Sequence, residues 1–220
     1  MSRGGASLIP TRMPRTPANT AVYHITDVAN LPRILQSGGL YSDVALTAAG
    51  GPAQQIGYGH IKQRRMTQLR VDCCGNRFVG EFVPFYYCPR SVMLYTINMG
   101  NTGLPKGCQT TIVHLVSTVA TGISLGRAWA ISDGNAGAAH ATFSAHPSAL
   151  DNLDWSAIDA NSWGGRTHQK AAEFLVADFF PWTAISHIGC HNANVQAAVT
   201  QMLVAQAHRP PVSVNRHWYY

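Results

Sequence analysis

The sequence predicts an α+β fold in a single domain, and three observations support this. Segments with a strand pattern and segments with a helix pattern are short and mixed, without the regular alternation of a β-α-β protein. Of the 220 residues, 46% are hydrophobic, which allows one substantial core. Residues 1–19 combine Arg3, Arg12 and Arg15 with Pro, Gly and Ser, and they lack the apolar run of a secretory signal. We expect a disordered leader there and a single domain over 20–220.

The domain is predicted to open with a strand followed by a short helix. An apolar, β-branched run starts at Ala21, and Asp27 suits the N-cap of a helix. Leu31, Ile34 and Leu35 then repeat at helical spacing. Two consecutive glycines end this helix.

The next segments carry weaker signals. Residues 42–60 contain Gly, Ala and Pro with little periodicity, so we predict a loop that leads into a basic turn over 60–65. Residues 78–87 are strongly aromatic but contain Pro84, which favours an edge or bulged strand over a central one. Residues 91–97 are apolar and fit a helix or a strand.

The clearest strand of the chain covers residues 110–119. This segment is rich in β-branched residues and bounded by glycines, so we expect it in the core sheet. The remaining predicted elements are, in chain order, a strand over 127–131, a turn over 132–135, an Ala-rich helix over 136–143, a short helix within 151–163, strands over 170–179 and 185–190, a helix over 194–207 and a closing strand over 212–220.

The composition favours a polyanionic partner such as a nucleic acid. The 16 Lys and Arg exceed the 10 acidic residues, the formal net charge is +6, and the pI is near 9.3. The five cysteines form no Cys-x-x-Cys pair, so neither a disulfide framework nor a zinc knuckle is indicated and a cytoplasmic location is expected. No His spacing predicts a metal site. No stretch approaches the ~18 apolar residues of a membrane span.

Glu173 is the leading candidate for a catalytic carboxylate. The chain has only one other glutamate, Glu81, so a mechanism that needs this residue type has few candidates. Glu173 follows a basic, Gly-rich loop over 164–170 and precedes the apolar run 174–176. A buried carboxylate is costly unless it is paired. The residues alone leave two readings open, a functional group and a structural salt bridge to a nearby Arg.

Two further groups of polar residues could bind a ligand. His24 and Thr26 point to the same face of the first strand, because side chains alternate along a strand. The alternative is a histidine whose hydrogen bonds are satisfied inside the core. The adjacent Arg64 and Arg65 could hold a phosphate bidentately, or they could form a solvated pair of charges.

These sequence segments and their order resemble those of one family, the DarT toxins of bacterial toxin–antitoxin systems. The DarT toxins are DNA ADP-ribosyltransferases. The resemblance runs from about Tyr23 to Tyr220. The matching stretches are Tyr23-His24-Ile25-Thr26, Asn30-Leu31-Pro32-Arg33-Ile34-Leu35, Gly38-Gly39-Leu40, Phe82-Val83-Pro84-Phe85-Tyr86, Pro89-Arg90-Ser91, Met93-Leu94-Tyr95, Ser132-Asp133-Gly134-Asn135-Ala136, Leu153-Asp154-Trp155, Ala172-Glu173-Phe174-Leu175-Val176, Pro181-Trp182 and Trp218-Tyr219-Tyr220.

The resemblance implies a fold and an activity. The fold is that of the ADP-ribosyltransferases, with two small antiparallel sheets facing each other and NAD⁺ in the cleft between them. The activity is the transfer of ADP-ribose from NAD⁺ to a base of single-stranded DNA. It also implies a toxin whose modification is removed by a partner, the macrodomain antitoxin DarG. No feature of the sequence requires a metal or a dimer, so we expect a metal-free monomer.

The resemblance also implies the residues of the NAD⁺ cleft. His24, Thr26 and Asn30 match positions on the adenosine and ribose side. Arg65 matches the arginine that holds the NAD⁺ phosphates and supports catalysis, and Arg64 is the rival assignment for that role.

Three further roles follow from the resemblance. Gly57 lies in the loop before the phosphate-binding arginine, and Met93 lies near the nicotinamide end of the cleft. Glu173 matches the catalytic glutamate. It follows a mobile loop, here within 161–172, that recognises the substrate. The basic residues of this loop are then expected to contact DNA. They are Arg166, His168 and Lys170.

The sequence departs from the family in places, and rival functions stay open. Asn135 stands where some relatives have His. The family divides into thymine and guanine modifiers, and the Tyr-His-Ile-Thr opening resembles the thymine branch. The same fold acting on RNA or protein is one rival. A second is a basic binding module in which Glu173 only pairs with Arg65 or Arg166. A third, a degraded transferase, is disfavoured because Glu173, Arg65 and His24 are retained.

Overall fold

The computed structural model describes residues 14–56 and 59–220 and confirms the α+β class. The strands are β1 Ala21–Asp27, β2 Gly39–Tyr41, β3 Arg70–Val71, β4 Arg77–Phe78, β5 Phe82–Tyr86, β6 Ile112–Thr118, β7 Trp129–Ser132, β8 Phe143–Ser144, β9 Glu173–Ala177, β10 Phe179–Pro181, β11 His187–Cys190 and β12 Val212–Val214. The helices are α1 Leu31–Gln36, α2 Asp43–Ala48, α3 Gly59–Thr67, α4 Val92–Asn98, α5 Val119–Ser124, α6 Trp155–Ile158, α7 Thr167–Lys170 and α8 Ala193–Leu203.

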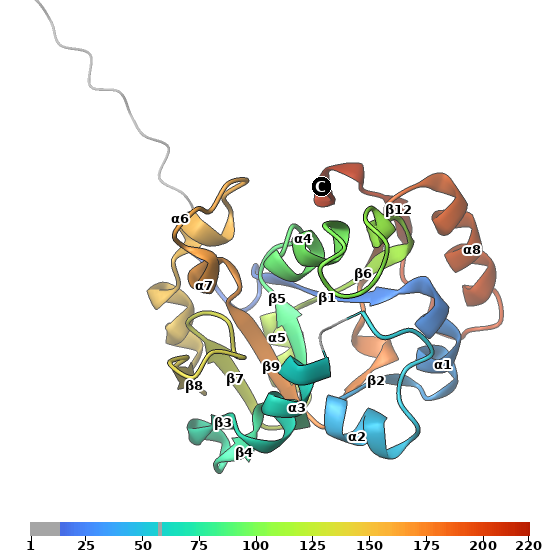
Figure 1. Cartoon of the computed structure of the whole chain (residues 1–220). Helices are drawn as coiled ribbons and strands as arrows, with labels where there is room; N and C mark the ends of the chain where they lie inside the picture. Colours follow the sequence, from blue (N-terminus) through green and yellow to red (C-terminus); the bar gives the residue numbers. More distant parts are fainter. Residues whose placement is uncertain (1–13, 57–58) are drawn as a thin grey trace, which may run out of the picture.

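Within the described residues, the main sheet has eight strands in the order β12-β11-β6-β1-β5-β9-β7-β8 (Figure 1). β11 and β12 are parallel, and the other neighbouring strands are antiparallel. β1 pairs with β6 along its whole length but meets β5 at one register pair, Tyr23 opposite Tyr86. The two sheets implied by the resemblance are therefore joined into one. The join is narrow, because β1 and β5 diverge beyond that pair.

Pro84 does not place its strand at an edge. The prediction was an edge or bulged strand rather than a central one; β5 lies between β1 and β9, so the edge part was wrong and the strand is central. The carbonyl oxygen of Pro84 lies 2.9 Å from Nδ1 of His24 on β1. Since the N and C=O of one strand residue face the same neighbour, the missing N–H of Pro84 also falls on the β1 side. The β1–β5 ladder is already open there, so a central strand tolerates the proline.

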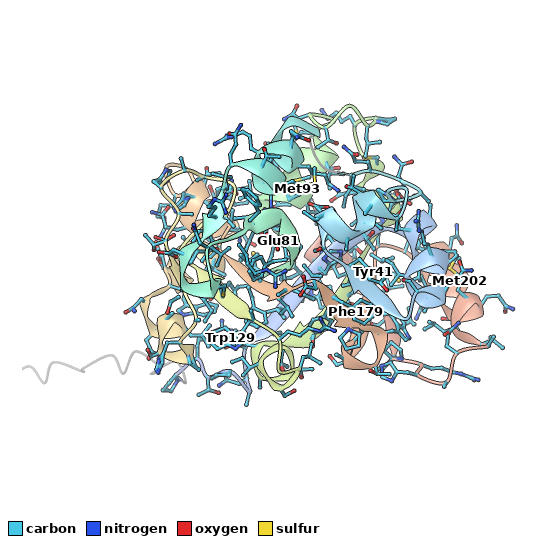
Figure 2. The ribbon with its side chains drawn as sticks, turned by 90° about the horizontal axis from the view of Figure 1, so that it is seen from below. Tyr41, Glu81, Met93, Trp129, Phe179 and Met202 are labelled. Carbon is cyan, nitrogen blue, oxygen red and sulfur yellow. The ribbon has the colours of Figure 1, made fainter. Side chains whose placement is uncertain are left out.

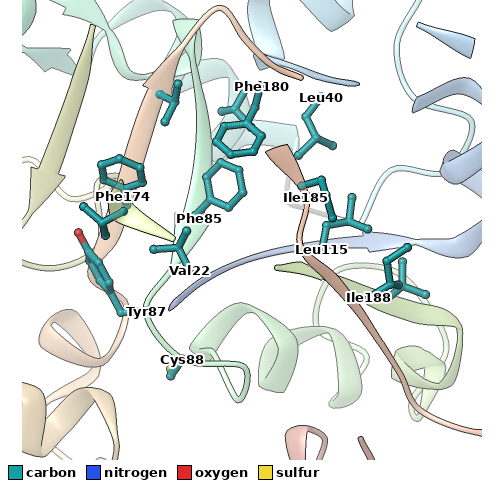
Figure 3. Close-up of a cluster of buried hydrophobic side chains, with 14 of the residues drawn as sticks. Val22, Leu40, Phe85, Tyr87, Cys88, Leu115, Phe174, Phe180, Ile185 and Ile188 are labelled. Atoms are coloured by element: carbon teal, nitrogen blue, oxygen red, sulfur yellow. The ribbon is translucent and has the colours of Figure 1, made fainter. Parts of the chain in front are cut away.

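The core lies against both halves of the sheet. The strand predicted over 110–119 is β6, and its residues 112–117 are buried. Figure 3 shows Phe85 of β5 beside Phe180, with a ring-centroid distance of 4.7 Å, and Phe174 of β9 in the same cluster. This packing positions β9 and therefore its first residue, Glu173.

Three predictions need correction: the loop over 42–60, the basic turn over 60–65 and the helix over 136–143. Residues 42–60 contain α2, whose N-cap Ser42 accepts from the N–H of Ala45, and the predicted basic turn over 60–65 lies within α3. Residues 136–143 do not form the predicted Ala-rich helix. There, Oδ1 of Asn135 accepts the N–H of Gly137 at 2.8 Å, which replaces a helical hydrogen bond.

Other predicted boundaries shift by a few residues. Residues 91–97, which fitted either pattern, belong to a helix, α4, capped by Ser91. The strand predicted over 170–179 begins at Glu173, because Lys170 belongs to α7. The closing strand ends at Val214 and is followed by a 3₁₀ turn.

Part of the predicted leader contacts the fold. Residues 1–13 lie outside the described residues, but a turn covers residues 17–19. The guanidinium of Arg15 lies 3.2 Å from the carboxylate of Asp159 and 4.4 Å from the ring centre of Trp155. The end of the predicted leader is therefore attached to the neighbourhood of α6.

His114 is a buried titratable group in the centre of β6. Its Nε2–H donates to the carbonyl of Pro89 at 2.9 Å, and its Nδ1 lies 3.2 Å from the hydroxyl of Tyr219. Burial lowers the pKa of His114 from 6.5 to about 4, although the Pro89 carbonyl opposes this shift. The folded protein therefore holds His114 neutral at pH 7.

Stability is expected to fall as the pH drops from 6.5 to about 4. In that window the unfolded chain protonates His114 and the folded chain does not, which costs up to about 3 kcal/mol of unfolding free energy. Urea unfolding at pH 7 and pH 4.5 should show a smaller pH loss in His114→Gln than in the wild type. Equal losses in both proteins would contradict this prediction.

Candidate active site

A cavity of about 500 Å³ opens where β1 and β5 diverge. Its wall includes residues of β1, β2, β5 and helices α1 to α4. Figure 2 labels Met93 of α4 and Tyr41 of β2, which line it from separate elements. The predicted residues that line it are His24, Thr26, Asn30, Arg65 and Met93. Gly57 lies outside the described residues.

Arg65 and Glu173 form a buried, bidentate ion pair beside this cavity. The two hydrogen bonds run from Nη1 to Oε1 at 3.1 Å and from Nη2 to Oε2 at 2.9 Å. Arg65 is 8% exposed and Glu173 is 1% exposed. Burial lowers the pKa of Arg65, but the charge and hydrogen bonds of Glu173 outweigh this and raise the pKa above its ordinary value. Arg65 is therefore positively charged at neutral pH.

Arg65 has a further donor beyond those that it uses in the ion pair. Its Nε is buried and has no hydrogen-bond partner in the described part of the chain. A buried donor without a partner costs free energy, so its retention indicates a ligand acceptor. Arg65 lines the cavity, whereas Glu173 lies behind it and is not among the lining residues. The structure thus contains the salt bridge of the structural reading, and the functional reading of Glu173 stays a prediction.

Glu173 is held by the segment that follows β7. Oγ of Ser132 accepts the N–H of Glu173 at 2.9 Å and donates to the carbonyl of Gly134 at 2.6 Å. The N–H of Ala136 donates to Oε1 of Glu173 at 3.1 Å. The residue pattern around Ser132 predicted a turn over 132–135 but gave no sign that this segment holds Glu173. Its positioning role depends on contacts between β7 and β9 that no local pattern encodes.

The β1 residues lie where the strand alternation predicted them. His24 lines the cavity, its Nδ1 contacts the Pro84 carbonyl, and burial lowers its pKa, so the ring is neutral at pH 7. Asn30 donates to Oγ1 of Thr26 at 3.1 Å. Its amide also exchanges two hydrogen bonds with the backbone of Gln54, at 2.7 and 2.8 Å. Asn30 therefore secures the cavity wall formed by the loop after α2.

Helix α3 separates the two adjacent arginines. Successive helical residues differ by about 100° in direction, so Arg65 points inward and is buried while Arg64 is exposed. Lys62, three residues before Arg65, lies on the same helix face and also lines the cavity. Its Nζ lies 2.8 Å from the carboxylate of Asp43. Lys62 was not predicted to line the cavity, because the sequence predicted a turn over 60–65; helical spacing would have paired it with Arg65.

The three basic residues of the predicted substrate loop lie in different environments. Arg166 is 43% exposed in its side chain and donates to Oγ of Ser156 at 2.6 Å. Lys170 is 2% exposed, and its Nζ donates to the carbonyls of Ile158 and Ala160 at 2.6 and 2.8 Å. Lys170 is thus turned away from the surface on which a DNA contact was expected.

His168 connects the loop to the segment that holds Glu173. Its Nε2 lies 3.5 Å from Oδ1 of Asp133, and its ring centre lies 4.4 Å from that of His140. A Cβ at Gly134 would lie 2.2 Å from the His168 ring, so the glycine permits this close approach. Asn135, next in the chain, lines the cavity.

The described residues contain neither a cluster of metal-ligating side chains nor a membrane-spanning helix. No group of three or more His, Cys, Asp and Glu side chains is arranged to hold a metal ion in residues 14–56 and 59–220. In the same residues, no helix has the length and apolar character needed to cross a membrane.

The chain is similar to known proteins over most of its length. A family model described as "ssDNA thymidine ADP-ribosyltransferase, DarT" matches residues 23–220. A DNA ADP-ribosyl transferase of Thermus aquaticus is 39% identical over 208 residues, which is 93% of this chain and 90% of that protein. A DNA ADP-ribosyl transferase of Mycobacterium tuberculosis is 30% identical over 86% of this chain and 84% of that protein.

Solved structures agree with these relatives. The structure of Thermus sp. 2.9 DarT in complex with ADP-ribosylated ssDNA has a TM-score of 0.87 and 36% identity, and the match covers 94% of this chain and 100% of that one. The structure of the same Thermus protein in complex with NAD⁺ has a TM-score of 0.82 and 33% identity, with the same coverage.

Proposed function

Because the chain belongs to the DarT family of single-stranded DNA thymidine ADP-ribosyltransferases, we propose that it modifies thymine, with Arg65 and Glu173 as its catalytic pair. The chain is an enzyme that uses NAD⁺ as co-substrate and transfers ADP-ribose to single-stranded DNA. The observation that carries the proposed roles is the buried Arg65–Glu173 pair beside the cavity, with the Nε of Arg65 unpartnered in the described residues.

The cavity fits a dinucleotide that carries a pyrophosphate. A volume of about 500 Å³ is within the range of cofactor sites. Lys62 and Arg65 lie on one face of α3, where each is paired with a carboxylate, of Asp43 and of Glu173 respectively. The free donor of Arg65 suits a phosphate oxygen, because a guanidinium binds phosphate through several N–H groups. We assign the phosphates to this face, with Met93 toward the nicotinamide and His24 and Thr26 toward the adenosine side.

Glu173 supplies the negative charge that the reaction needs. Positive charge develops on the ribose as its bond to nicotinamide breaks, and a nearby carboxylate stabilises that charge. The nicotinamide leaves with the bonding electrons, a base nitrogen forms the new bond to the ribose carbon, and the nitrogen loses its proton. Glu173 is placed to take that proton once Arg65 has released the Glu173 carboxylate. A shift of Arg65 from the carboxylate to the phosphates would achieve this release.

Replacing Lys62 by Met is expected to raise the KM for NAD⁺ by at least about tenfold, because a charge-assisted hydrogen bond to phosphate contributes about 1.5–3 kcal/mol. Steady-state kinetics with NAD⁺ as the varied substrate would measure this. Lys106→Met removes the same charge from an exposed position that does not line the cavity, and it is the matched control. An equal KM for the two variants would remove Lys62 from the site.

The direct test of the proposed function is incubation with NAD⁺ and a panel of single-stranded oligonucleotides, followed by intact mass. We expect a gain of one ADP-ribose on oligonucleotides that contain thymine and no gain on the same sequences as duplexes, where the base edge is paired. A gain only on guanine-containing strands would reject the thymine assignment. A gain on RNA or protein, with none on DNA, would overturn the substrate class.

We also propose a location, an oligomeric state and a partner for the enzyme. We place it in the cytoplasm as a monomeric toxin, where NAD⁺ and unpaired DNA are both present, with its modification reversed by a macrodomain antitoxin of the DarG type. The resemblance to the DarT toxins supports this. Induction in a bacterial host should arrest growth, and co-expression of a DarG-type macrodomain should restore it. Growth arrest that the macrodomain does not relieve would reject the antitoxin assignment.

We propose that Arg166 and His168 of the substrate loop contact DNA and that the buried Lys170 does not. Arg166 is partly exposed, and His168 lies beside the segment that holds Glu173. The buried Lys170 instead secures the backbone between α6 and α7.

A further inference from the structure

Three aromatic rings from distant parts of the chain meet at the start of the substrate loop. Tyr95 belongs to α4, Trp163 lies in the loop before α7, and Tyr220 lies at the C-terminal end, which Figure 1 shows beside α4. The ring-centre distances are 5.6 Å for Tyr95–Trp163, 5.2 Å for Tyr95–Tyr220 and 5.8 Å for Trp163–Tyr220. All three pairs meet edge to face, so no two of these rings are stacked in parallel. We name this group the ring cluster.

The ring cluster lies next to the proposed active site on the same helix. Val92, Met93 and Thr96 of α4 line the cavity. Tyr95 points to the adjacent face of that helix and remains 40% exposed. A ring that served only to pack the C-terminal end would gain from burial, so this exposure leaves contact area for a ligand.

A cation borders the ring cluster. The guanidinium of Arg90 lies 4.5 Å from the ring centre of Tyr220, and its Nη1 donates to Oδ1 of Asn161 at 3.0 Å. Arg90 forms no ion pair within residues 14–56 and 59–220, and its Nε is buried there without a hydrogen-bond partner. Arg90 therefore keeps both an uncompensated charge and a free donor, which suit a phosphate oxygen.

We propose that the ring cluster and Arg90 form a second nucleotide subsite, which stacks an unpaired base next to the modified one and binds its phosphate. This inference rests on the proposed function. Aromatic rings beside a cation are the combination that binds single-stranded nucleic acid, since every base offers a face for stacking. The subsite is continuous with the substrate loop, because Asn161 and Trp163 belong to residues 161–172. An unpaired strand entering the active site would pass from one to the other.

The binding arm of the test uses poly(dT) strands that carry one 2-aminopurine, moved along the sequence. Stacking on an aromatic ring quenches 2-aminopurine fluorescence. We expect strong quenching by the wild type at one flanking position and its loss in Tyr95→Ala. Tyr95→Phe keeps the ring and should restore quenching. Met99→Ala removes another exposed side chain at the end of α4 and should quench as the wild type does.

The affinity arm measures Kd and KM for the same strands. Tyr95→Ala should weaken both by about tenfold, which corresponds to the lower part of the range for one stacked base. Arg90→Gln should lower the slope of log K against log salt by about 0.7, the amount for one phosphate contact on a single strand. Arg90→Lys keeps the charge and should keep the slope.

The outcomes separate this inference from the proposed function. If the wild type transfers ADP-ribose to DNA while Tyr95→Ala and Met99→Ala give equal quenching and equal KM, the subsite is rejected and the function stands. If the wild type modifies no DNA, the proposed function fails. The quenching result would then show only whether an unpaired base stacks on the ring cluster. An unchanged salt slope in Arg90→Gln would reject the phosphate contact.

Discussion

Replacing Glu173 by Gln is expected to lower the rate constant of ADP-ribose transfer by about 10²- to 10³-fold, the usual loss when one preorganised electrostatic group is removed from an active site. The amide has nearly the shape of the carboxylate but cannot stabilise developing positive charge or accept the proton of the base. The KM for NAD⁺ should change much less than kcat, because Arg65 and Lys62 stay in the cavity wall. Mass-detected transfer and nicotinamide release would be measured together.

A matched control exists because the chain contains only one other glutamate. Glu81 pairs with Arg77 at 2.9 Å and accepts the N–H of Phe78 at 2.8 Å, apart from the cavity. Glu81→Gln removes the same charge and should retain activity close to that of the wild type. If Glu173→Gln also retained more than a tenth of wild-type turnover while remaining folded, the catalytic assignment would be wrong.

Replacing Arg65 by Met is expected to reduce the free energy of unfolding by about 3–5 kcal/mol, because it leaves the buried carboxylate of Glu173 without its cation. The loss should appear in urea unfolding at pH 7. Arg64→Met, one residue away on the exposed face of α3, should change stability by no more than about 0.5 kcal/mol. Two similar values would show that the buried pair is not the source of the loss.

The double variant Arg65→Met with Glu173→Gln separates charge from packing. Removing both charges of a buried pair is often neutral, whereas removing one is costly. We therefore expect the double variant to regain most of the stability that Arg65→Met loses, while remaining inactive. Additive losses would mean that packing rather than charge dominates at this site.

Much of the sheet could be predicted because strand patterns are local. The β-branched run at 110–119 and the alternation around His24 identified β6 and β1, since side chains that alternate across a sheet leave a period of two in the sequence. Glu173 was singled out as an acid before an apolar run, and its catalytic role stays a prediction. Its scarcity as a residue type narrowed the choice further.

The predictions failed where long-range contacts outweighed local propensity. Ala136 and its neighbours have helical propensity, yet the N–H of Ala136 donates to Glu173, 37 positions away, and Asn135 accepts the N–H of Gly137. Pro84 was assigned to an edge because the divergence of β1 and β5 has no sequence signature. The α3 helix was missed because its composition is polar and weakly periodic.

The sequence by itself determined the family, the α+β class, the charge that favours DNA, and Glu173 with Arg65 as the residues to test. These follow from ordered motifs and residue types, which are local properties. Only the tertiary structure decided that Arg65 rather than Arg64 meets Glu173, that Lys62 joins the cavity and that Lys170 is buried. The physical reason is that each outcome depends on burial and on partners that are distant in sequence. The sequence shows the same basic residue type whether its side chain faces water, a ligand or a buried carbonyl.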